Sequence, residues 1–231
     1  MSILCLGDSL TYGSYGYSYI PFLGGNINVY NRGVNGDTIA GAFKRAKRYV
    51  ADKRYQDADT YIVSIGTNDC LLPFLSGLSP LWATQMKLRF IWQKCCLSQA
   101  QFAQAYEDLI DLLIQNGKRV IVIGLPYMQI KGFPTCELIL RNQLIEKLAK
   151  RKSLNYVDAR QIQCGIAGSC QNVHSWGCCG LARVFDGALM HLLPGTKDWL
   201  SQKRNLSLTV DGCHYNSASA KAIGEAVRVH L

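Results

Sequence analysis

The sequence predicts a doubly wound α/β domain, in which helices cover both faces of a mostly parallel sheet. Short apolar runs alternate along the chain with segments of helical periodicity. The apolar runs are continuous rather than alternating, which is typical of strands that are buried on both faces. The chain has 231 residues, and a domain of that length removes about 70 per cent of its unfolded surface from water. One large core is therefore expected.

Five short apolar runs are expected to form the strands. They cover residues 3–6, 27–30, 61–65, 120–123 and 154–157. Helices are expected where apolar residues recur every three or four positions, at residues 39–50, 102–113, 140–148 and 216–230. Ser98 with Gln101 matches a capping box before the second helix, and Gly117 is a stop signal after it. Asn216 is expected to cap the last helix.

Two segments interrupt this alternation, and we interpret both as insertions into a single domain that spans residues 1–231. Residues 70–97 are rich in Leu, Trp and Pro, and residues 159–207 are rich in Gly and Cys. Long loops in α/β folds are often functional, because ligands bind beyond the carboxyl ends of the strands. The first insertion is expected either to wall the binding pocket or to be an ordinary packed helix. Its candidate wall residues are Leu71, Leu72, Phe74, Leu78, Leu81, Trp82 and Trp92.

The composition limits the classes of protein that fit. Hydrophobic residues make up 48% and charged residues 18% of the chain, which excludes general disorder. The net charge is +9, but no nucleic-acid-binding motif accompanies it, so we expect no nucleic-acid partner. The basic residues are interpreted as solvated helix faces. They cluster as Lys44, Arg45, Lys47 and Arg48, and as Lys147, Lys150, Arg151 and Lys152.

No segment of the sequence resembles a membrane-spanning helix or a secretory leader. The longest uncharged stretch, residues 70–86, is interrupted by Pro73, Gly77 and Pro80, whereas a spanning helix needs about 20 consecutive apolar residues. No stable membrane insertion is therefore expected. If Met1 is the native start, the expected location is cytoplasmic, and a leader removed beforehand would make the protein an exported one.

Four short polar blocks contain the residues that can perform chemistry. They are GDSL at 7–10, NRGVNG at 31–36, GTND at 66–69 and DGCH at 211–214. Each block alone is consistent with a turn or a helix cap. Three of them follow predicted strands, and the carboxyl ends of parallel strands meet at one edge of a sheet. Together they supply a hydroxyl, an imidazole, a carboxylate and amide donors, which is the set that acyl transfer requires.

These four blocks resemble those of the GDSL, or SGNH, hydrolases. The letters S, G, N and H fall on Ser9, Gly33, Asn68 and His214. The resemblance covers most of the chain but explains neither insertion. It implies a flavodoxin-like α/β/α fold of three layers with a five-stranded sheet. It also implies hydrolysis of carboxylic esters without a metal or other cofactor.

The resemblance implies a role for each member of a catalytic triad. Ser9 would attack the ester carbonyl and form an acyl-enzyme. His214 would take the serine proton and later return it to the leaving alcohol, so activity is expected to rise from acidic pH to a plateau. Asp211 would hold the imidazole in the correct tautomer.

The resemblance also implies an oxyanion hole. The backbone N–H groups of Ser9 and Gly33 and the side-chain amide of Asn68 would bind the developing negative charge. Asp8 and Asp69 are expected to support these groups from behind. The alternative for both aspartates is ordinary hydrogen bonding within their loops.

The expected substrate is a small acylated molecule. The ending DGCHYN at 211–216 resembles carbohydrate O-acetylesterases, and a short-chain acylhydrolase is equally open. Two other classes of function remain as alternatives. One is an acyltransferase that uses the same acyl-enzyme, and the other is a non-catalytic binding module with the same fold. The sequence does not determine the oligomeric state.

The chain has ten cysteines, many for a protein of the cytoplasm. Free buried thiols are the default expectation, and disulfides or a structural zinc site are the alternatives. The short C-x₂₋₄-C spacing typical of zinc knuckles is absent from the main cluster. Cys5 is expected in the core and Cys213 in packing. The clustered residues are Cys95 with Cys96, and Cys164, Cys170, Cys178 and Cys179 with His174.

Overall fold

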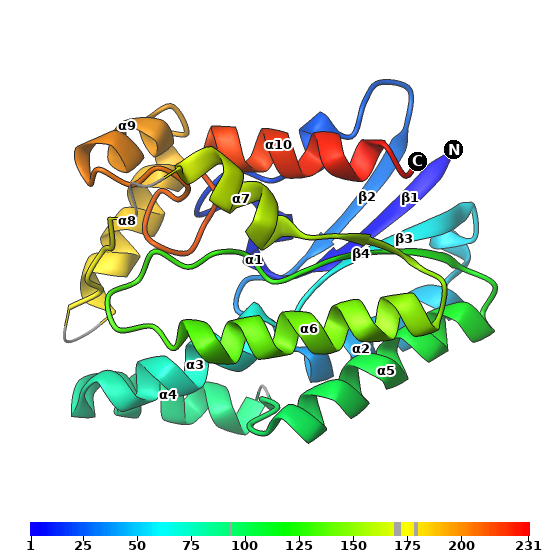
Figure 1. Ribbon diagram of the computed structural model, residues 1–231, viewed down its shortest axis with the longest axis horizontal. Helices are drawn as coiled ribbons and strands as arrows, with labels where there is room; N and C mark the ends of the chain where they lie inside the picture. The colour runs from blue at the N-terminus through cyan, green and yellow to red at the C-terminus, as the bar shows by residue number, and fades with distance from the viewer. Residues whose placement is uncertain (93, 169–171, 178–179) are drawn as a thin grey trace.

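Five parallel strands form one sheet in the computed structural model, in the order β2-β1-β3-β4-β5 (Figure 1). The structure describes residues 1–92, 94–168, 172–177 and 180–231, and of these only the backbone at 88, 90–92 and 181–184. The predicted parallel sheet and its five strands are confirmed. The strands are β1 (Ser2–Gly7), β2 (Asn28–Gly33), β3 (Ala58–Ser64), β4 (Arg119–Ile123) and β5 (Asn155–Val157).

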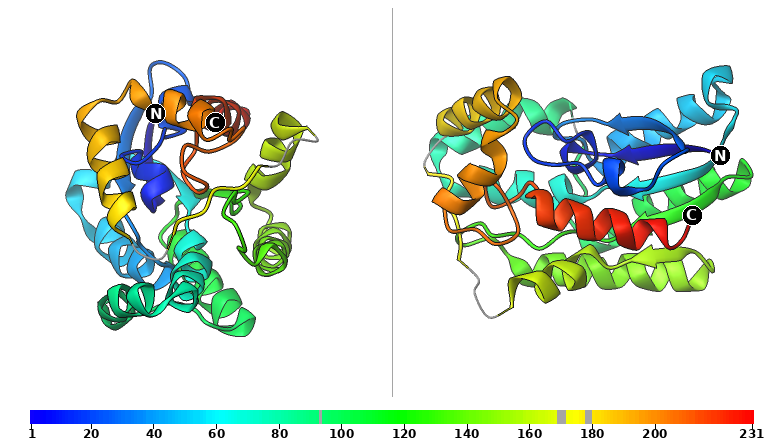
Figure 2. Two further views of the ribbon diagram at one scale, coloured as in Figure 1. Left: turned by 90° about the vertical axis from the view of Figure 1, so that its left-hand side faces the viewer. Right: turned by 90° about the horizontal axis from the view of Figure 1, so that it is seen from above.

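Helices cover both faces of the sheet and give the predicted α/β/α layers (Figures 1 and 2). Side chains alternate along β1, so that Leu4 and Leu6 join one apolar core while Ile3 and Cys5 join the other. The first core is covered by α2 (Ile39–Ala51), α3 (Thr67–Leu78), α4 (Pro80–Trp92), α5 (Gln99–Gln115) and α6 (Thr135–Arg151). The second is covered by α1 (Ser9–Tyr12), α7 (Ala159–Ala167) and α10 (Ser217–Arg228).

The strand order reverses at β1, and this reversal locates the site. The chain runs from β1 outward to β2 and then returns across β1 to β3. Ligands of open α/β sheets bind beyond the carboxyl ends of the strands at such a switch point. Because α1 follows β1 and α3 follows β3, the first and third polar blocks begin beside each other at this edge.

Local capping signals of the sequence are reproduced in the helices. The capping box of Ser98 and Gln101 begins α5, and Gly117 follows that helix with a φ of 69°. Asn216 caps α10 by accepting a hydrogen bond from the N–H of Ser219. These helix ends depend on contacts between near neighbours in the chain, so the sequence predicts them directly.

The two insertions meet each other above the carboxyl edge of the sheet. The first forms α3 and α4, and the second includes α7, α8 (Leu181–Leu192) and α9 (Thr196–Lys203). The ring centroids of Trp82 and Trp176 lie 6.2 Å apart, and the N–H of Gly180 donates to Gln85 Oε1 at 3.0 Å. We call residues 70–92, 172–177 and 180–203 the cap. That the whole chain is one domain with two insertions stays an interpretation.

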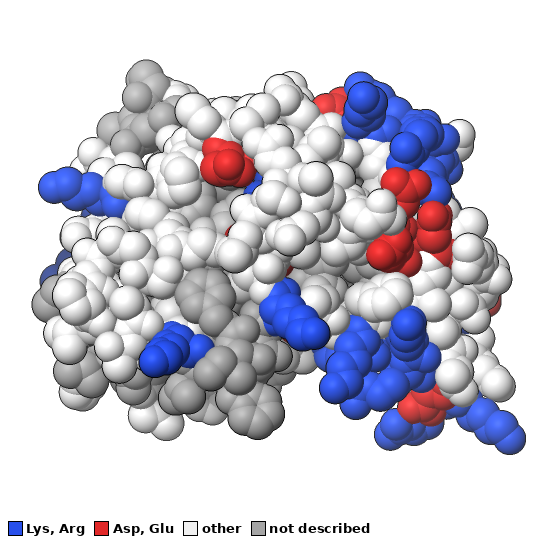
Figure 3. Space-filling view, turned by 90° about the horizontal axis from the view of Figure 1, so that it is seen from below, with Lys and Arg blue, Asp and Glu red and all other residues white. Residues whose placement is uncertain are grey.

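Opposite charges lie close together at one end of the molecular surface. Figure 3 shows Lys and Arg interspersed with Asp and Glu at the right-hand end of that view. Among them, Arg151 and Lys152 pair with Glu107, and Lys152 also pairs with Asp111. Arg45 is an exception to the predicted solvated helix face, because it is buried beside Asp37. In the described parts of the chain, no helix has the length and apolar character needed to span a membrane.

The described cysteines fit the default expectation of buried thiols only in part, because Cys95 and Cys164 are half-buried and Cys136 is exposed. Cys5, Cys70 and Cys96 are free and buried, and Cys5 lies in the core as predicted. Cys213 is also buried against the core. Cys170, Cys178 and Cys179 lie outside the described residues. The disulfide and zinc alternatives for their cluster therefore stay predictions.

Candidate active site

Ser9 is the first residue of α1 and lies just beyond the end of β1. Asp8 caps this short helix, because its carboxylate accepts a hydrogen bond from the N–H of Leu10 at 2.9 Å. Gly7 permits the tight passage from strand to helix, since a Cβ there would lie 2.0 Å from Oγ1 of Thr11. The result is a serine at the sheet edge that lines a pocket while remaining only 8% exposed.

His214 and Asp211 lie in the turn that precedes α10. The Asp211 carboxylate accepts hydrogen bonds from the N–H groups of Cys213 at 2.9 Å and His214 at 2.8 Å. Its second oxygen lies 2.7 Å from Nδ1 of the His214 ring. Gly212 completes the turn with a φ of 95°. The indole N–H of Trp176 donates to the Asp211 carbonyl at 2.6 Å, so the buried turn is fixed from two sides.

The turn brings His214 to Ser9 across 205 positions of sequence. Nε2 of the imidazole lies 2.9 Å from the serine Oγ. Because Nδ1 faces a carboxylate, the stable neutral tautomer has its proton on Nδ1 and leaves Nε2 to accept the serine hydrogen. A hydroxyl, an imidazole and an orienting carboxylate in one line is the arrangement that activates a serine nucleophile.

Asn68, the second residue of α3, lines the same pocket. Its side-chain N–H₂ donates to the Asp37 carbonyl at 2.9 Å and lies 3.4 Å from a carboxylate oxygen of Asp8. Arg45 holds Asp37 in place, since its guanidinium pairs with the Asp37 carboxylate and donates to the Gly7 carbonyl at 2.9 Å. Both amide hydrogens of Asn68 thus have an acceptor, and the contact with Asp8 is the longer and weaker of the two.

Gly33 is not placed as an oxyanion donor, contrary to the expectation from its motif. Its N–H donates to Oδ1 of Asn31 at 2.9 Å, and a Cβ at this position would lie 2.3 Å from the backbone nitrogen of Tyr12. Gly33 thus serves the close packing of β2 on α1. Gly36, the second glycine of the same block, lines the pocket beside Asn35 with a φ of 75°. Both glycines belong to the motif at 31–36, and only the path of the loop shows which of them lines the pocket.

Asp8 and Asp69 lie behind the pocket, and both are buried. Asp69 accepts hydrogen bonds from the N–H of Ile39 at 3.0 Å and of Cys96 at 2.8 Å, which ties the start of α2 to the chain that leaves α4. Burial raises the pKa of Asp8 to about 7 and the pKa of Asp69 to about 6, against the lowering effect of their backbone hydrogen bonds. Both carboxyl groups join elements around the site, and their support of the oxyanion donors stays a prediction.

A pocket of about 310 Å³ opens beside Ser9 and His214, between the sheet edge and the cap. Leu71, Leu72 and Trp82 contribute to its wall, in agreement with the expectation for the first insertion. Among the described residues, the apolar lining is Leu71, Leu72, Leu75, Trp82, Met86 and Trp176. Tyr15, Asn35, Gln85 and Arg89 also line the pocket, together with Ser9, Asn68 and His214. Leu75 and Met86 follow Leu71 and Trp82 by four positions, a spacing that places them on the same helix face.

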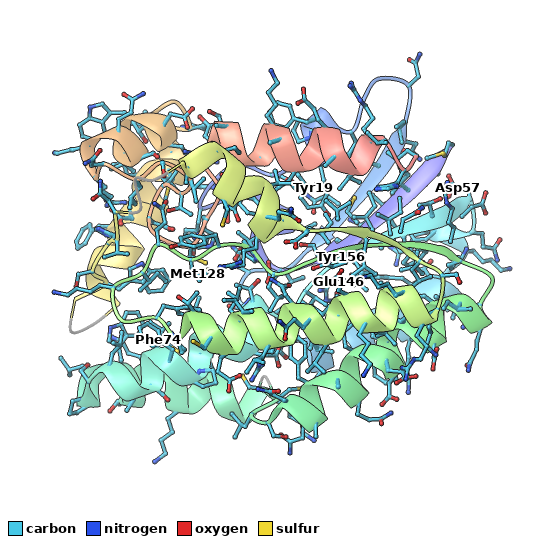
Figure 4. All side chains as sticks on the ribbon, viewed as in Figure 1. Tyr19, Asp57, Phe74, Met128, Glu146 and Tyr156 are labelled. Atoms are coloured by element: carbon cyan, nitrogen blue, oxygen red, sulfur yellow. The ribbon has the colours of Figure 1, made fainter. Side chains whose placement is uncertain are left out.

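The remaining residues of the predicted wall lie elsewhere. Phe74 packs edge-on against Phe133 of the loop before α6, with 5.2 Å between ring centroids (Figure 4). Leu78 and Leu81 are exposed where α3 passes into α4. The side chain of Trp92 is outside the described residues. A helix presents only one face to a pocket, so an apolar segment cannot contribute every residue to it.

Two aromatic residues that the sequence did not single out contact the histidine and the aspartate. The ring of Tyr15 lies 5.3 Å from the ring of His214, and Trp176 binds the Asp211 carbonyl. Both come from loops, and neither belongs to a motif. Their contacts join residues that are distant in sequence, so no local pattern indicates them.

The fold and the site together define an α/β enzyme with the side-chain arrangement of a serine hydrolase. The sheet order, the serine after β1 and the histidine before the last helix all agree with this class. The chain belongs to the GDSL-like lipase/acylhydrolase family, whose model matches residues 3–227. The resemblance of the four blocks is thereby confirmed, and the protein is a carboxylic-ester hydrolase.

Solved structures of low sequence identity share the fold. A lipase/acylhydrolase from Enterococcus faecalis matches with a TM-score of 0.62 and 16% identity, over 99% of this chain and 94% of that one. An acetyl xylan esterase matches with a TM-score of 0.60 and 13% identity over 100% of both chains. An acetylxylan esterase from Geobacillus stearothermophilus matches with a TM-score of 0.58 and 17% identity, over 100% of this chain and 94% of that one. No curated protein sequence matches this chain.

Proposed function

We propose that the protein hydrolyses esters through an acyl-enzyme formed on Ser9. The observation that supports this most is the line of hydrogen bonds from Asp211 through His214 to the serine Oγ, with distances of 2.7 and 2.9 Å. This line ends in the pocket, where an ester carbonyl can approach the serine. The only co-reactant that the reaction requires is the water molecule that releases the acyl group from the serine.

Each step of the proposed reaction uses a group of this chain. Ser9 Oγ attacks the carbonyl carbon while His214 accepts the proton, and the carbonyl oxygen becomes an oxyanion. The N–H groups of Ser9 and Gly36 and the amide of Asn68 are the proposed donors to that oxyanion. His214 then protonates the leaving alcohol, and a water molecule repeats the sequence to release the acid. Asp211 stabilises the imidazolium in both halves of the reaction.

The six apolar side chains of the pocket favour a short apolar acyl group over a sugar as the part of the substrate that enters it, although Asn35, Gln85 and Arg89 also line it. Small-molecule sites have volumes of about 300–1,000 Å³, so the pocket of about 310 Å³ is a small one. Trp82 and Trp176 are buried, 4% and 7% exposed, and their faces are not open platforms for a sugar ring. We therefore propose a short-chain acylhydrolase, and a carbohydrate O-acetylesterase is the second candidate.

Replacing Ser9 tests the acyl-enzyme. Ser9→Ala should lower kcat by about 10⁴-fold or more with the fold intact, because only oxyanion binding then remains. Ser76→Ala is the matched control, since Ser76 lies on α3 and bonds to the Pro73 carbonyl. Pre-steady-state kinetics with p-nitrophenyl acetate should show a burst of p-nitrophenol release in the native enzyme and in Ser76→Ala, but none in Ser9→Ala. A folded and fully active Ser9→Ala enzyme would contradict the proposal.

The same assay separates the alternative functions. An added alcohol acceptor that diverts most of the acyl group from water would indicate an acyltransferase. Absence of turnover and of a burst with every ester tried would indicate a binding module. Hydrolysis that the acceptor leaves unchanged supports the esterase.

A further inference from the structure

Lys197, on α9, is a buried cation that the proposed mechanism does not use. It is 8% exposed, and within the described chain no carboxylate forms an ion pair with it. A buried ammonium group needs partners for its three N–H donors, because it has lost water. Its Nζ donates to the carbonyls of Gly13 at 2.9 Å and Gly16 at 2.7 Å, and lies 5.3 Å from the ring centroid of Tyr17.

All of these contacts fall on one segment, residues 13–17, which connects the two sides of the site. The segment begins where α1 ends, and the N–H of Gly13 donates to the Ser9 carbonyl at 2.9 Å. At its other end, the N–H of Tyr17 donates to the Tyr215 carbonyl at 2.9 Å. The segment therefore spans from the helix of the serine to the neighbour of the histidine.

The middle of the segment packs directly on His214. The ring of Tyr15 lies 5.3 Å from the imidazole at an angle of 40°. A Cβ on Gly16 would lie 2.8 Å from the Cβ of His214, so the backbone approaches as closely as glycine allows. Helix α8 supports Tyr15 from its other side, because a Cβ on Gly187 would lie 2.3 Å from Cε1 of that ring.

We propose that Lys197 is a positioning residue for the base. It fixes the segment 13–17 so that Tyr15 confines the His214 imidazole to the orientation that reaches both of its hydrogen-bond partners. Without the two carbonyl contacts, the segment gains freedom and the productive orientation is less populated. The second insertion, which contains α8 and α9, thereby acts on the chemistry as well as on the pocket. This inference rests on the proposed role of His214.

Lys197→Met tests the proposal, because methionine keeps the length of the side chain and removes its donors. We expect kcat to fall about 10- to 100-fold with a smaller change in KM, since Lys197 itself does not line the pocket, although Tyr15 does. Lys203→Met is the matched control on the same helix, where the exposed ammonium lies 4.8 Å from the ring of Trp199. The control should keep the native kcat.

Proton NMR of the imidazoles reports the chemical shift of the His214 ring, which depends on the position of the Tyr15 ring. A loss of stability alone would not change this chemical shift in the same way. The chain has four histidines, so His214→Ala identifies the relevant resonance. Tyr15→Leu removes the ring current on His214, whereas Tyr15→Phe retains it. The His214 resonance of Lys197→Met should move toward its position in Tyr15→Leu. A native resonance and a native kcat in folded Lys197→Met would overturn the proposal.

The Tyr15 and Ser9 variants separate this proposal from the proposed function. If Lys197→Met does not fold, the Tyr15 variants decide, and a native kcat in Tyr15→Leu overturns the proposal. An active Ser9→Ala enzyme would instead contradict the proposed function. An inactive Ser9→Ala enzyme together with native behaviour of Lys197→Met would contradict this inference alone.

Discussion

The catalytic edge of the sheet and the cap are held together by contacts of different range. At the edge, Asp8 binds the N–H of Leu10, and Asp211 binds the N–H of His214, so donor and acceptor are two or three residues apart. In the cap, the contacts join residues about 95 positions apart, such as Gln85 and Gly180. A short motif can therefore determine the geometry of each block at the edge, whereas the cap takes its shape from packing between distant segments. The blocks themselves also meet through long-range contacts, such as that of His214 with Ser9 across 205 positions.

We expect the edge of the sheet to determine the rate of the reaction and the wall of the pocket to determine which ester is preferred. Changes at the edge should reduce the rate for every ester, because they act on the groups that take part in each turnover. Changes to the pocket-lining residues of the cap should alter which ester is preferred, because these residues form the apolar wall of the pocket. Lys197 is the exception in the cap, since we propose that it acts on the rate. The variants below test that division, in order of decreasing expected effect.

Asp211→Asn should produce the largest loss among these variants. The asparagine amide would donate to Nδ1 and so favour the tautomer in which Nε2 cannot accept the serine proton. We expect kcat to fall by about 10⁴-fold, while the backbone bonds to Cys213 and His214 preserve the turn. Asp59→Asn, an exposed change on β3, is the control for steady-state kinetics. A loss below tenfold would argue against Asp211 as the orienting carboxylate.

Asn68→Ala should lower kcat less, by about 10²- to 10³-fold, because one of several oxyanion donors is lost. KM should change little, since the contact strengthens only in the transition state. If the folded Asn68→Ala variant hydrolyses every ester as fast as the native enzyme does, Asn68 only supports the Asp37 carbonyl. Thermal unfolding in parallel measures that structural contribution.

Met86→Ala tests the cap and should change preference rather than rate. Removing this side chain enlarges the apolar part of the pocket, so longer acyl chains should gain relative to acetate. A difference of one or two methylene groups changes discrimination by roughly 10- to 200-fold, and we expect the lower end of that range. The measurement is kcat/KM for p-nitrophenyl esters from C2 to C8. Leu81→Ala, at an exposed position of α4, should keep the native preference.

Asp8→Asn should have the smallest effect, which is seen in the pH dependence of stability. Burial raises the pKa of Asp8 to about 7 from its usual 3.8, so between these values the folded state retains a proton that the unfolded chain releases. The free energy of unfolding contributed by this group therefore falls as pH rises from about 4 to 7. Denaturant unfolding of both proteins across this range should show the variant gaining relative stability with pH. Parallel curves would contradict the raised pKa.

The sequence by itself determined the parallel sheet, the ends of several helices and the positions of Ser9, His214 and Asp211. These features depend on apolar runs or on hydrogen bonds between residues a few positions apart, and the order of strands then brings the blocks to one edge.

Only the tertiary structure decided which glycine lines the pocket and which face of α3 turns inward. It also decided that Tyr15 and Trp176 contact the histidine–aspartate pair and that Lys197 binds the segment that carries Tyr15. Gly33 and Gly36 are equally plausible in the motif, and the loop path assigns the first to packing and the second to the pocket. Lys197 lies 181 positions from Gly16, the carbonyl that it binds. Contacts of that range arise from the packing of whole elements, and no local preference of the chain specifies them.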